Sequence, residues 1–144
     1  MNPRAVKATL LIGLFLFSAN LNAQVQSKSQ AAGGDLIGRG QYIVERVAMC
    51  VECHTPRGKN GDLQRTEYLK GAPVYVKSPP YPQMKWALKA PAIAGLPGYT
   101  EEQGIRLLTE GVTRDGRRPD PPMPQYRLNR SDAQAVVVYL KSLR

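Results

Sequence analysis

The residues best suited to chemistry lie together in one short segment. The chain has two cysteines and one histidine, and all three fall within residues 50–54, at Cys50, Cys53 and His54. A catalytic site with two histidines and a framework of several disulfides are therefore excluded. A structural zinc site uses four ligands, and the chain has only three cysteines and histidines in total. A thioredoxin-type redox pair belongs in a βαβ setting, and a lone disulfide leaves the position of the only histidine unexplained.

The Cys-x-x-Cys-His spacing predicts the covalent attachment of one haem (heme). This motif is the attachment signature of c-type haem, in which each thiol adds across one vinyl group of the porphyrin. Two intervening residues on a helical turn match the separation of the vinyl groups, and the adjacent histidine is then placed beneath the iron. We therefore predict that Cys50 and Cys53 hold one covalent haem c and that His54 is an iron ligand.

The sequence around the motif predicts an all-α fold of three main helices joined by long Pro-rich loops. Apolar residues recur at spacings of three and four over residues 36–51, which predicts a helix that runs directly into the motif. Capping boxes at residues 100–103 and 131–134, with Thr and Ser as the N-caps, predict the starts of two further helices. Gly111 is a natural stop for the first of these. Residues 55–98 hold seven prolines, which exclude a central strand or a continuous helix.

A second iron ligand is sought among the methionines Met49, Met84 and Met123. Met49 directly precedes Cys50 and lies on the histidine side of the haem, so it cannot reach the opposite face. Met123 is flanked by prolines, which restrict the backbone and would help to hold the thioether sulfur at a fixed distance from iron. Met123 is therefore the predicted ligand. Met84, in the middle loop, is the reserve candidate, and a role for residues 60–90 is not predicted.

The amino terminus has the pattern of a cleaved export signal. Arg4 and Lys7 precede an apolar run over residues 10–17, and small or polar residues follow. The apolar run is too short for a membrane-spanning helix, which needs about 20 residues. We predict a signal peptide over residues 1–23, a flexible leader over residues 24–34 and a periplasmic location. The mature chain then keeps a formal charge of +7, since the net charge of +9 loses only Arg4 and Lys7.

The chain resembles class I monohaem cytochromes c over roughly residues 36–144. It is similar to the haem modules of the cytochrome subunits that serve periplasmic alcohol and gluconate-type dehydrogenases. Those subunits usually carry three such modules, whereas this chain has one. The resemblance rests on five segments: Gly40-Gln41-Tyr42-Ile43-Val44, Cys50 to Gly58, Gly111 to Arg118, Met123-Pro124-Gln125-Tyr126 and Ser131 to Leu143.

The resemblance implies a cytochrome c domain over residues 35–144, with His54 and Met123 as the two iron ligands. It also implies that Gly40 and Tyr42 of the first helix meet Tyr139 and Leu140 of the last. In this family the histidine usually donates its second N–H to a proline carbonyl, for which Pro73 is a candidate. The side chains considered as partners of the haem propionates are Trp86, Tyr75 and Arg57.

These observations predict an electron carrier rather than an enzyme. The carrier would pass one electron between a dehydrogenase or quinol oxidoreductase and a terminal acceptor. Six arginines between residues 106 and 130 form a basic rim, which predicts redox partners with an acidic docking face. Nucleic-acid binding is not expected, and membrane contact is expected to be at most peripheral. The alternatives are a fixed electron-transfer subunit of a dehydrogenase complex and a peroxidase-like haem enzyme with an open iron site.

Overall fold

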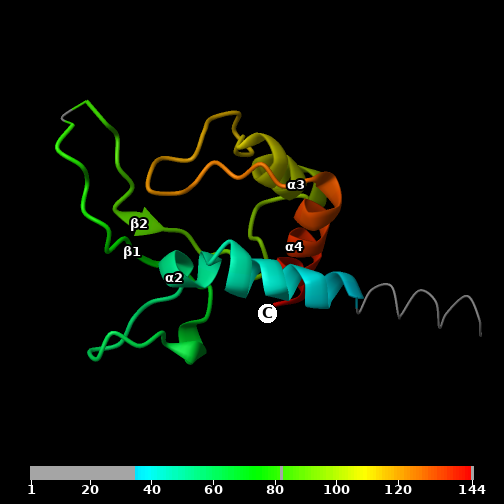
Figure 1. Ribbon diagram of the computed structural model, residues 1–144, viewed down its shortest axis with the longest axis horizontal. Helices are drawn as coiled ribbons and strands as arrows, with labels where there is room; N and C mark the ends of the chain where they lie inside the picture. Colours follow the sequence, from blue (N-terminus) through cyan, green and yellow to red (C-terminus); the bar gives the residue numbers. More distant parts are fainter. Residues whose placement is uncertain (1–34, 82, 144) are drawn as a thin grey trace, which may run out of the picture. The chain divides into compact units, whose positions relative to one another are not determined.

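The computed structural model of the protein describes residues 35–81 and 83–143. The predicted signal peptide (1–23) and leader (24–34) lie outside these residues, and Leu36–Arg144 form one compact unit. The described elements follow one another in this order (Figure 1): an α-helical segment over residues 35–42, the π-helix η1 (Ile43–Val47), α2 (Cys50–His54), the 3-10 helix η2 (Arg65–Glu67), β1 (Ala72–Pro73), β2 (Lys89–Ala90), α3 (Glu101–Glu110) and α4 (Arg130–Ser142).

The first helical segment stops short of the cysteine motif, whereas the sequence predicted one continuous helix. The segment widens into the π-helical turn η1 at its end, where the N–H of Ala48 donates to the carbonyl of Ile43, five residues back, at 2.7 Å. Met49 then adopts a left-handed conformation with φ of 53°, and α2 begins at Cys50. The expectation of a helix running directly into the motif is therefore wrong, because this left-handed residue redirects the chain between η1 and α2.

The ends of α3 follow the sequence prediction. The hydroxyl of Thr100 accepts from the N–H of Gln103 at 3.2 Å, and the Gln103 side chain accepts from the N–H of Thr100 at 3.0 Å. This reciprocal pair is the predicted capping box. The helix ends at Gly111, which adopts a left-handed conformation with φ of 70°, so the predicted stop is confirmed as well.

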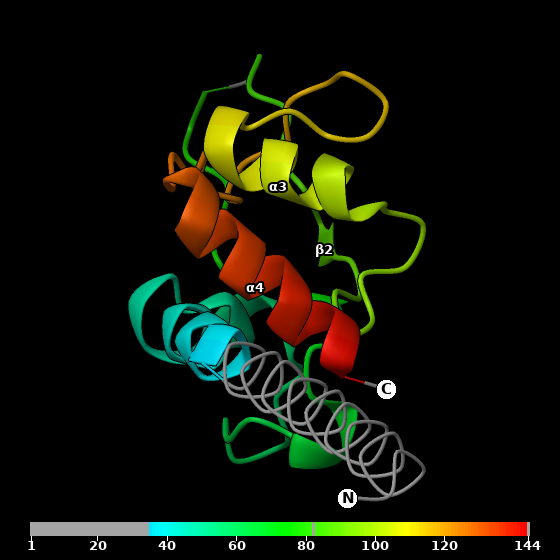
Figure 2. The same cartoon turned by 90° about the vertical axis from the view of Figure 1, so that its right-hand side faces the viewer.

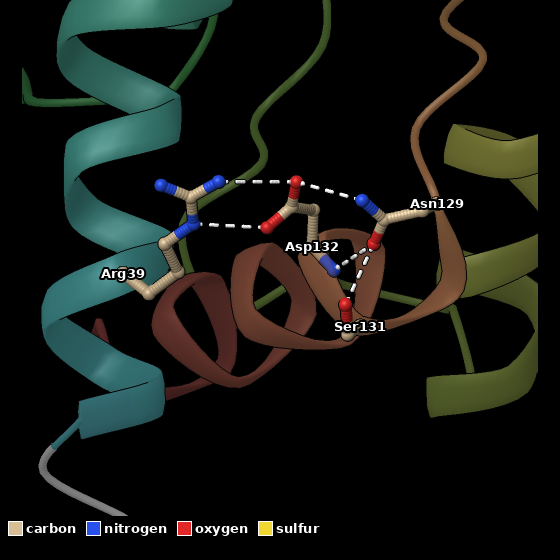
Figure 3. A network of polar contacts seen from close by, with 4 residues as sticks. All are labelled: Arg39, Asn129, Ser131 and Asp132. Carbon is tan, nitrogen blue, oxygen red and sulfur yellow. Dashed lines mark hydrogen bonds and ion pairs between the residues drawn. The ribbon is translucent and has the colours of Figure 1, made fainter.

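The start of α4 differs from the prediction, because the N-cap is Asn129 rather than Ser131. Asn129 Oδ1 accepts from the backbone N–H of Asp132 at 2.8 Å, and the Ser131 hydroxyl donates to the same oxygen at 2.7 Å. Arg39 of the first helical segment reaches across to the Asp132 carboxylate, with Nε at 2.9 Å (Figure 3). Asn and Ser are equally good N-caps, so residue preference does not distinguish the two positions.

The core lies where α4 packs against α3 and η1 (Figures 1 and 2). The close approach of the first helical segment to α4 depends on Gly40, because a Cβ there would lie 2.1 Å from the carbonyl oxygen of Ala135. The same Cβ would lie 2.6 Å from Tyr139 Cβ, so the predicted meeting of Gly40 with Tyr139 is confirmed. Tyr42 is exposed instead. The main core residues are Ile43, Val44, Ile105, Leu108, Val136, Val137 and Leu140.

The middle of the chain is mostly loop, as its prolines predict. Strands β1 and β2 are antiparallel and only two residues long, with Ala72 opposite Ala90 and Pro73 opposite Lys89. The structure is thus predominantly helical, in agreement with the predicted fold class. Across the residues described, none of the helices has both the length and the apolar character needed to cross a bilayer.

Candidate functional site

Helix α2 brings the two cysteines and the histidine to one side of the chain. Cys53 and His54 follow Cys50 by three and four residues, spacings that place helical side chains on the same face as Cys50. All three line one cavity, and the two thiols are not joined to each other. Burial raises the pKa of the Cys50 thiol to about 11, so this group is a neutral thiol at pH 7.

The His54 imidazole is oriented by a backbone carbonyl that adjoins it in the cavity wall. Its Nδ1 lies 2.7 Å from the carbonyl oxygen of Pro91. Burial lowers the pKa of His54 and outweighs the opposing effect of this hydrogen bond, so the ring is neutral at pH 7. A neutral ring that donates from Nδ1 carries its free lone pair on Nε2, the form that binds a metal.

The expectation that Pro73 accepts from His54 is wrong, because Pro91 holds this position. Pro73 belongs to the short β1–β2 ladder, in which it pairs with Lys89, whereas Pro91 directly follows β2. The contact between His54 and Pro91 spans 37 residues of sequence. The spacing of the prolines carries no information on which of them the fold returns to the histidine, so the motif alone could not identify Pro91.

Gly71 makes room for the segment that carries Pro91. It adopts φ of 92°, and a Cβ there would lie 2.9 Å from the carbonyl oxygen of Ala90 and 3.0 Å from the carbonyl carbon of Pro91. The N–H of Gly71 also donates to the carbonyl of His54 at 2.8 Å. Gly71 therefore lies between the backbone of His54 and the segment that carries Pro91, and only a residue without a side chain fits there.

The cavity fits a large, flat apolar cofactor. Its volume is about 770 Å³, within the range of roughly 300–1,000 Å³ that is usual for cofactor sites. The thiols and the imidazole lie on one part of the wall, and most of the remainder is apolar. The apolar lining includes Val74, Val76, Ala87, Ile93, Leu96, Leu107, Met123 and Tyr126. This donor set and this lining match the requirements of a porphyrin attached through two thioethers.

The three methionines differ in their relation to the cavity. Met123 is half-buried and lines it, and the neighbouring Pro122 and Pro124 line it too. Met84 is exposed and does not belong to the lining. Met49 lines the cavity beside Cys50. The structure therefore brings the predicted Met123 to the same cavity as His54, and leaves the reserve candidate Met84 outside it.

The loop that carries Met123 is tied down at both ends. The Tyr126 hydroxyl donates to the carbonyl of Ala48, two residues before Cys50, at 2.7 Å. At the other end, the N–H of Ala87 donates to the carbonyl of Pro121 at 2.7 Å. Burial is the main cause that raises the pKa of Tyr126, so the phenol stays protonated and remains a donor. The place of Tyr126 in the Met-Pro segment is the one sequence signal that could have pointed to this anchoring role.

The side chains proposed as partners of the haem propionates are not the polar groups that line the cavity. Arg57, Tyr75 and Trp86 are not part of the lining, and the Trp86 indole instead donates to the carbonyl of Val76 at 3.1 Å. The charged side chains that do line the cavity are Glu52, Lys89, Arg114, Asp115, Arg117 and Asp120. Hydrogen bonds from Thr113 and then Arg117 lower the pKa of Asp115 to about 2.

Much of the predicted basic rim is already paired within the chain. Three of its arginines face carboxylates at 2.7–3.0 Å, in the pairs Arg106–Glu110, Arg117–Asp115 and Arg130–Glu102. Arg114 donates to the carbonyl of Gly98 at 2.9 Å and lies over the Tyr99 ring. Of the predicted rim, only Arg114 and Arg117 reach the cavity lining.

Two comparisons relate the chain to known proteins. A family model described as "Cytochrome c" matches residues 37–144. The chain is also similar to a "Fructose dehydrogenase cytochrome subunit" of Gluconobacter japonicus, with 27% identity over 152 aligned positions. That similarity covers 98% of this chain but 28% of the relative, so the chain spans less than a third of the relative's length. All residues that line the cavity fall within the range matched by the family model.

Proposed function

The chain belongs to the cytochrome c family and is an electron-transfer cytochrome with one covalent haem c, and we propose that it is a periplasmic one-electron carrier. Its donor would be a dehydrogenase or quinol oxidoreductase, and its acceptor a terminal oxidant such as an oxidase. In this role the chain is not an enzyme itself. Export through the predicted signal peptide would bring it to the compartment of these partners.

The roles of the chain's own residues follow from their places around the cavity. Cys50 and Cys53 fit the single attachment motif and would tether the cofactor through two thioether bonds. His54 would bind iron through Nε2, and Met123 would bind it through its thioether sulfur. When bound, haem supplies the one-electron Fe(II)/Fe(III) couple. The chain keeps this couple in an apolar cavity and orients the imidazole through Pro91.

The observation that carries the proposal is the presence of His54 and Met123 in the wall of one cavity. His54 and Met123 would hold the iron together, and a thioether ligand would raise the reduction potential relative to a second histidine. A peroxidase-like enzyme needs an open iron position with acid–base groups beside it. The chain has a single histidine, which favours electron transfer over this alternative.

The similarity to a dehydrogenase cytochrome subunit supports a dehydrogenase as the electron donor. The same similarity supports a second candidate function, in which the chain is a fixed electron-transfer subunit of a dehydrogenase complex. We propose redox partners with an acidic docking face, because Arg118 and Arg127 are exposed near Met123. Such docking would slow as the salt concentration rises. A fixed subunit would instead copurify with the dehydrogenase at high salt.

The proposal is tested by optical spectra of the purified holoprotein and of two methionine variants. Wild type should give a low-spin ferrous spectrum and the weak thioether-to-ferric band at long wavelength. Met123→Ala should abolish this band and allow rapid CO binding to the ferrous form, because one axial position opens. Met84→Ala is the matched control and should keep the band. A wild-type protein that is high-spin and binds CO rapidly would overturn the carrier proposal, and loss of the band only in Met84→Ala would overturn the choice of Met123.

A further inference from the structure

The segment between β1 and β2 forms a loop that extends away from the helices (Figure 1). Its described parts are residues 74–81 and 83–88, which we call the β1–β2 loop. The two arms are joined near the strands, where the N–H of Val74 donates to the carbonyl of Leu88 at 3.0 Å. Lys85 pairs with Asp120 at 3.1 Å, which ties the loop to the segment before Met123. The loop therefore has a defined attachment to the cavity wall.

This loop concentrates exposed apolar side chains. It holds five of the nine large hydrophobic residues that are exposed in the described part of the chain. Soluble proteins expose single apolar residues routinely, but a cluster of them in one segment marks an interaction site. The five residues and their exposed fractions are Tyr75 at 52%, Val76 at 55%, Tyr81 at 63%, Met84 at 41% and Leu88 at 83%.

The charge of the surrounding sequence has a single sign. No aspartate or glutamate occurs between Glu67 and Glu101, a stretch that contains four lysines and no arginine. Three of these lysines, Lys77, Lys85 and Lys89, are interleaved with the apolar residues of the loop or adjoin it. Lys85 already faces Asp120, so Lys77 and Lys89 supply the positive charge that an occupant of this surface would meet. Such an occupant must accept apolar side chains and carry negative charge around them.

We propose that the β1–β2 loop docks the protein on the surface of an anionic lipid bilayer. Tyr81 and Leu88 would enter the interfacial region, where aromatic rings and aliphatic chains are both favoured. Lys77 would stay at the level of the anionic headgroups. An acidic protein partner fits less well, because protein interfaces are enriched in arginine and depleted of lysine, the reverse of this segment.

Docking in this way would set the orientation of the cofactor cavity at the membrane. Val74, Val76 and Ala87 belong to the loop and also line the cavity. The loop would therefore place one wall of the cavity beside the bilayer, where membrane-bound redox partners are found. This membrane role stands apart from the electron-transfer role, because neither of them requires the other.

The test is sedimentation of the exported, haem-loaded protein with lipid vesicles. Vesicles of phosphatidylcholine alone are compared with vesicles of phosphatidylcholine and phosphatidylglycerol, and mass spectrometry establishes that all variants share one amino terminus. The variants are the double substitution Tyr81→Ser/Leu88→Ser and the charge reversal Lys77→Glu. Their matched controls are Val47→Ser, an exposed apolar residue of η1, and Lys59→Glu, an exposed lysine outside the loop. The absorbance spectrum of each variant verifies that the cofactor site is intact.

Wild type should bind the anionic vesicles and bind phosphatidylcholine alone much more weakly. The double variant should lose at least about tenfold in affinity, since one buried Leu side chain already contributes that much. Lys77→Glu should lose at least about fivefold in affinity, which is the contribution of one lysine near an anionic surface. Both controls should stay close to wild type. The proposal is overturned if wild type does not bind anionic vesicles at low salt, or if Lys59→Glu weakens binding as much as Lys77→Glu does. It is also overturned if the loop variants keep vesicle binding but slow electron transfer to an acidic protein partner.

Discussion

The backbone N–H of Gly71 donates to the carbonyl oxygen of His54 at 2.8 Å. The same glycine lies against the segment whose Pro91 carbonyl accepts from the His54 imidazole at 2.7 Å. One residue without a side chain thus contacts the backbone of the histidine and the segment whose Pro91 orients the ring. This arrangement makes the imidazole position depend on a site that lies 17 residues after the histidine in the sequence.

Substitution of Gly71 by Ala should therefore disturb the histidine without touching it. The new Cβ would meet three backbone atoms at 2.9–3.0 Å, and overpacking of this kind costs about 1–3 kcal/mol of folding free energy. If the segment with Pro91 moves away, the imidazole loses its acceptor and becomes a weaker electron donor, so the reduction potential should rise. Thermal unfolding and a redox titration of the holoprotein measure the two effects.

Gly61 offers a matched control for the backbone contribution. It has a similar φ of 86°, but a Cβ there would meet nothing within 4 Å. Gly61→Ala should show only the cost of a positive φ, about 1 kcal/mol, and keep the wild-type reduction potential. Equal potentials for the Gly71→Ala variant and wild type would contradict the role assigned to this position.

The contact between the first helical segment and α4 predicts opposite effects for two nearby glycines. Gly40→Ala places a Cβ 2.1 Å from the carbonyl oxygen of Ala135, so the helices must separate at a cost of about 1–3 kcal/mol or more. Gly38→Ala meets nothing within 4 Å and should stabilise the helix by about 0.5–1 kcal/mol. Denaturant unfolding of both variants measures this difference. Similar free energies of unfolding would rule out the close packing at Gly40.

Local patterns account for the parts of the fold and site that the sequence predicted. The Thr100–Gln103 capping box, the stop at Gly111 and the cysteine–histidine spacing each involve residues within one or two helical turns. Their geometry depends on the backbone between them, so the sequence contains the required information. The prediction of Met123 as an iron ligand rested on the family resemblance as well as on its flanking prolines.

The wrong predictions are of two kinds. Some concern contacts between segments that are distant in the sequence, and others concern neighbouring residues that suit a position equally well. Pro91 meets His54 because the loop returns through the β1–β2 ladder, and no local pattern distinguishes it from Pro73. Met49 interrupts the first helix although apolar periodicity continues through it, because periodicity reports burial and not the backbone conformation of one residue. Tyr42 was predicted to meet the last helix but is exposed, because a pattern of residue types does not determine which face of a helix packs.

The N-terminus of α4 provides a direct test of which residue caps it. Asn129→Ala removes the side chain that accepts from the Asp132 N–H, and loss of an N-cap costs about 1 kcal/mol. Ser131→Ala removes only the donor that supports this cap and should cost much less. Chemical denaturation compares the two variants. A larger loss in Ser131→Ala would restore the capping box that the sequence suggested.

Glu45 joins three elements and should make stability depend on acid pH. Its Oε1 accepts from the hydroxyls of Tyr68 at 2.7 Å and Tyr139 at 2.9 Å, and from Gln41 Nε2 at 3.1 Å. Burial acts to raise the pKa of Glu45, but these three hydrogen bonds outweigh it and bring the pKa below its ordinary value of 4.5.

A carboxylate whose pKa is lowered by folding stabilises the native state above its unfolded pKa, and this stabilisation is lost as the pH falls through the folded value. The free energy of unfolding of the wild type should therefore decrease as the pH drops below about 4.5. Glu45→Gln should be less stable at pH 7 and show a weaker dependence on pH in this range. Tyr68→Phe and Tyr139→Phe, which each remove one donor, should weaken the dependence in part. Denaturant unfolding between pH 3 and pH 7 measures these slopes, and an unchanged slope in Glu45→Gln would show that this carboxylate is not stabilised by the fold.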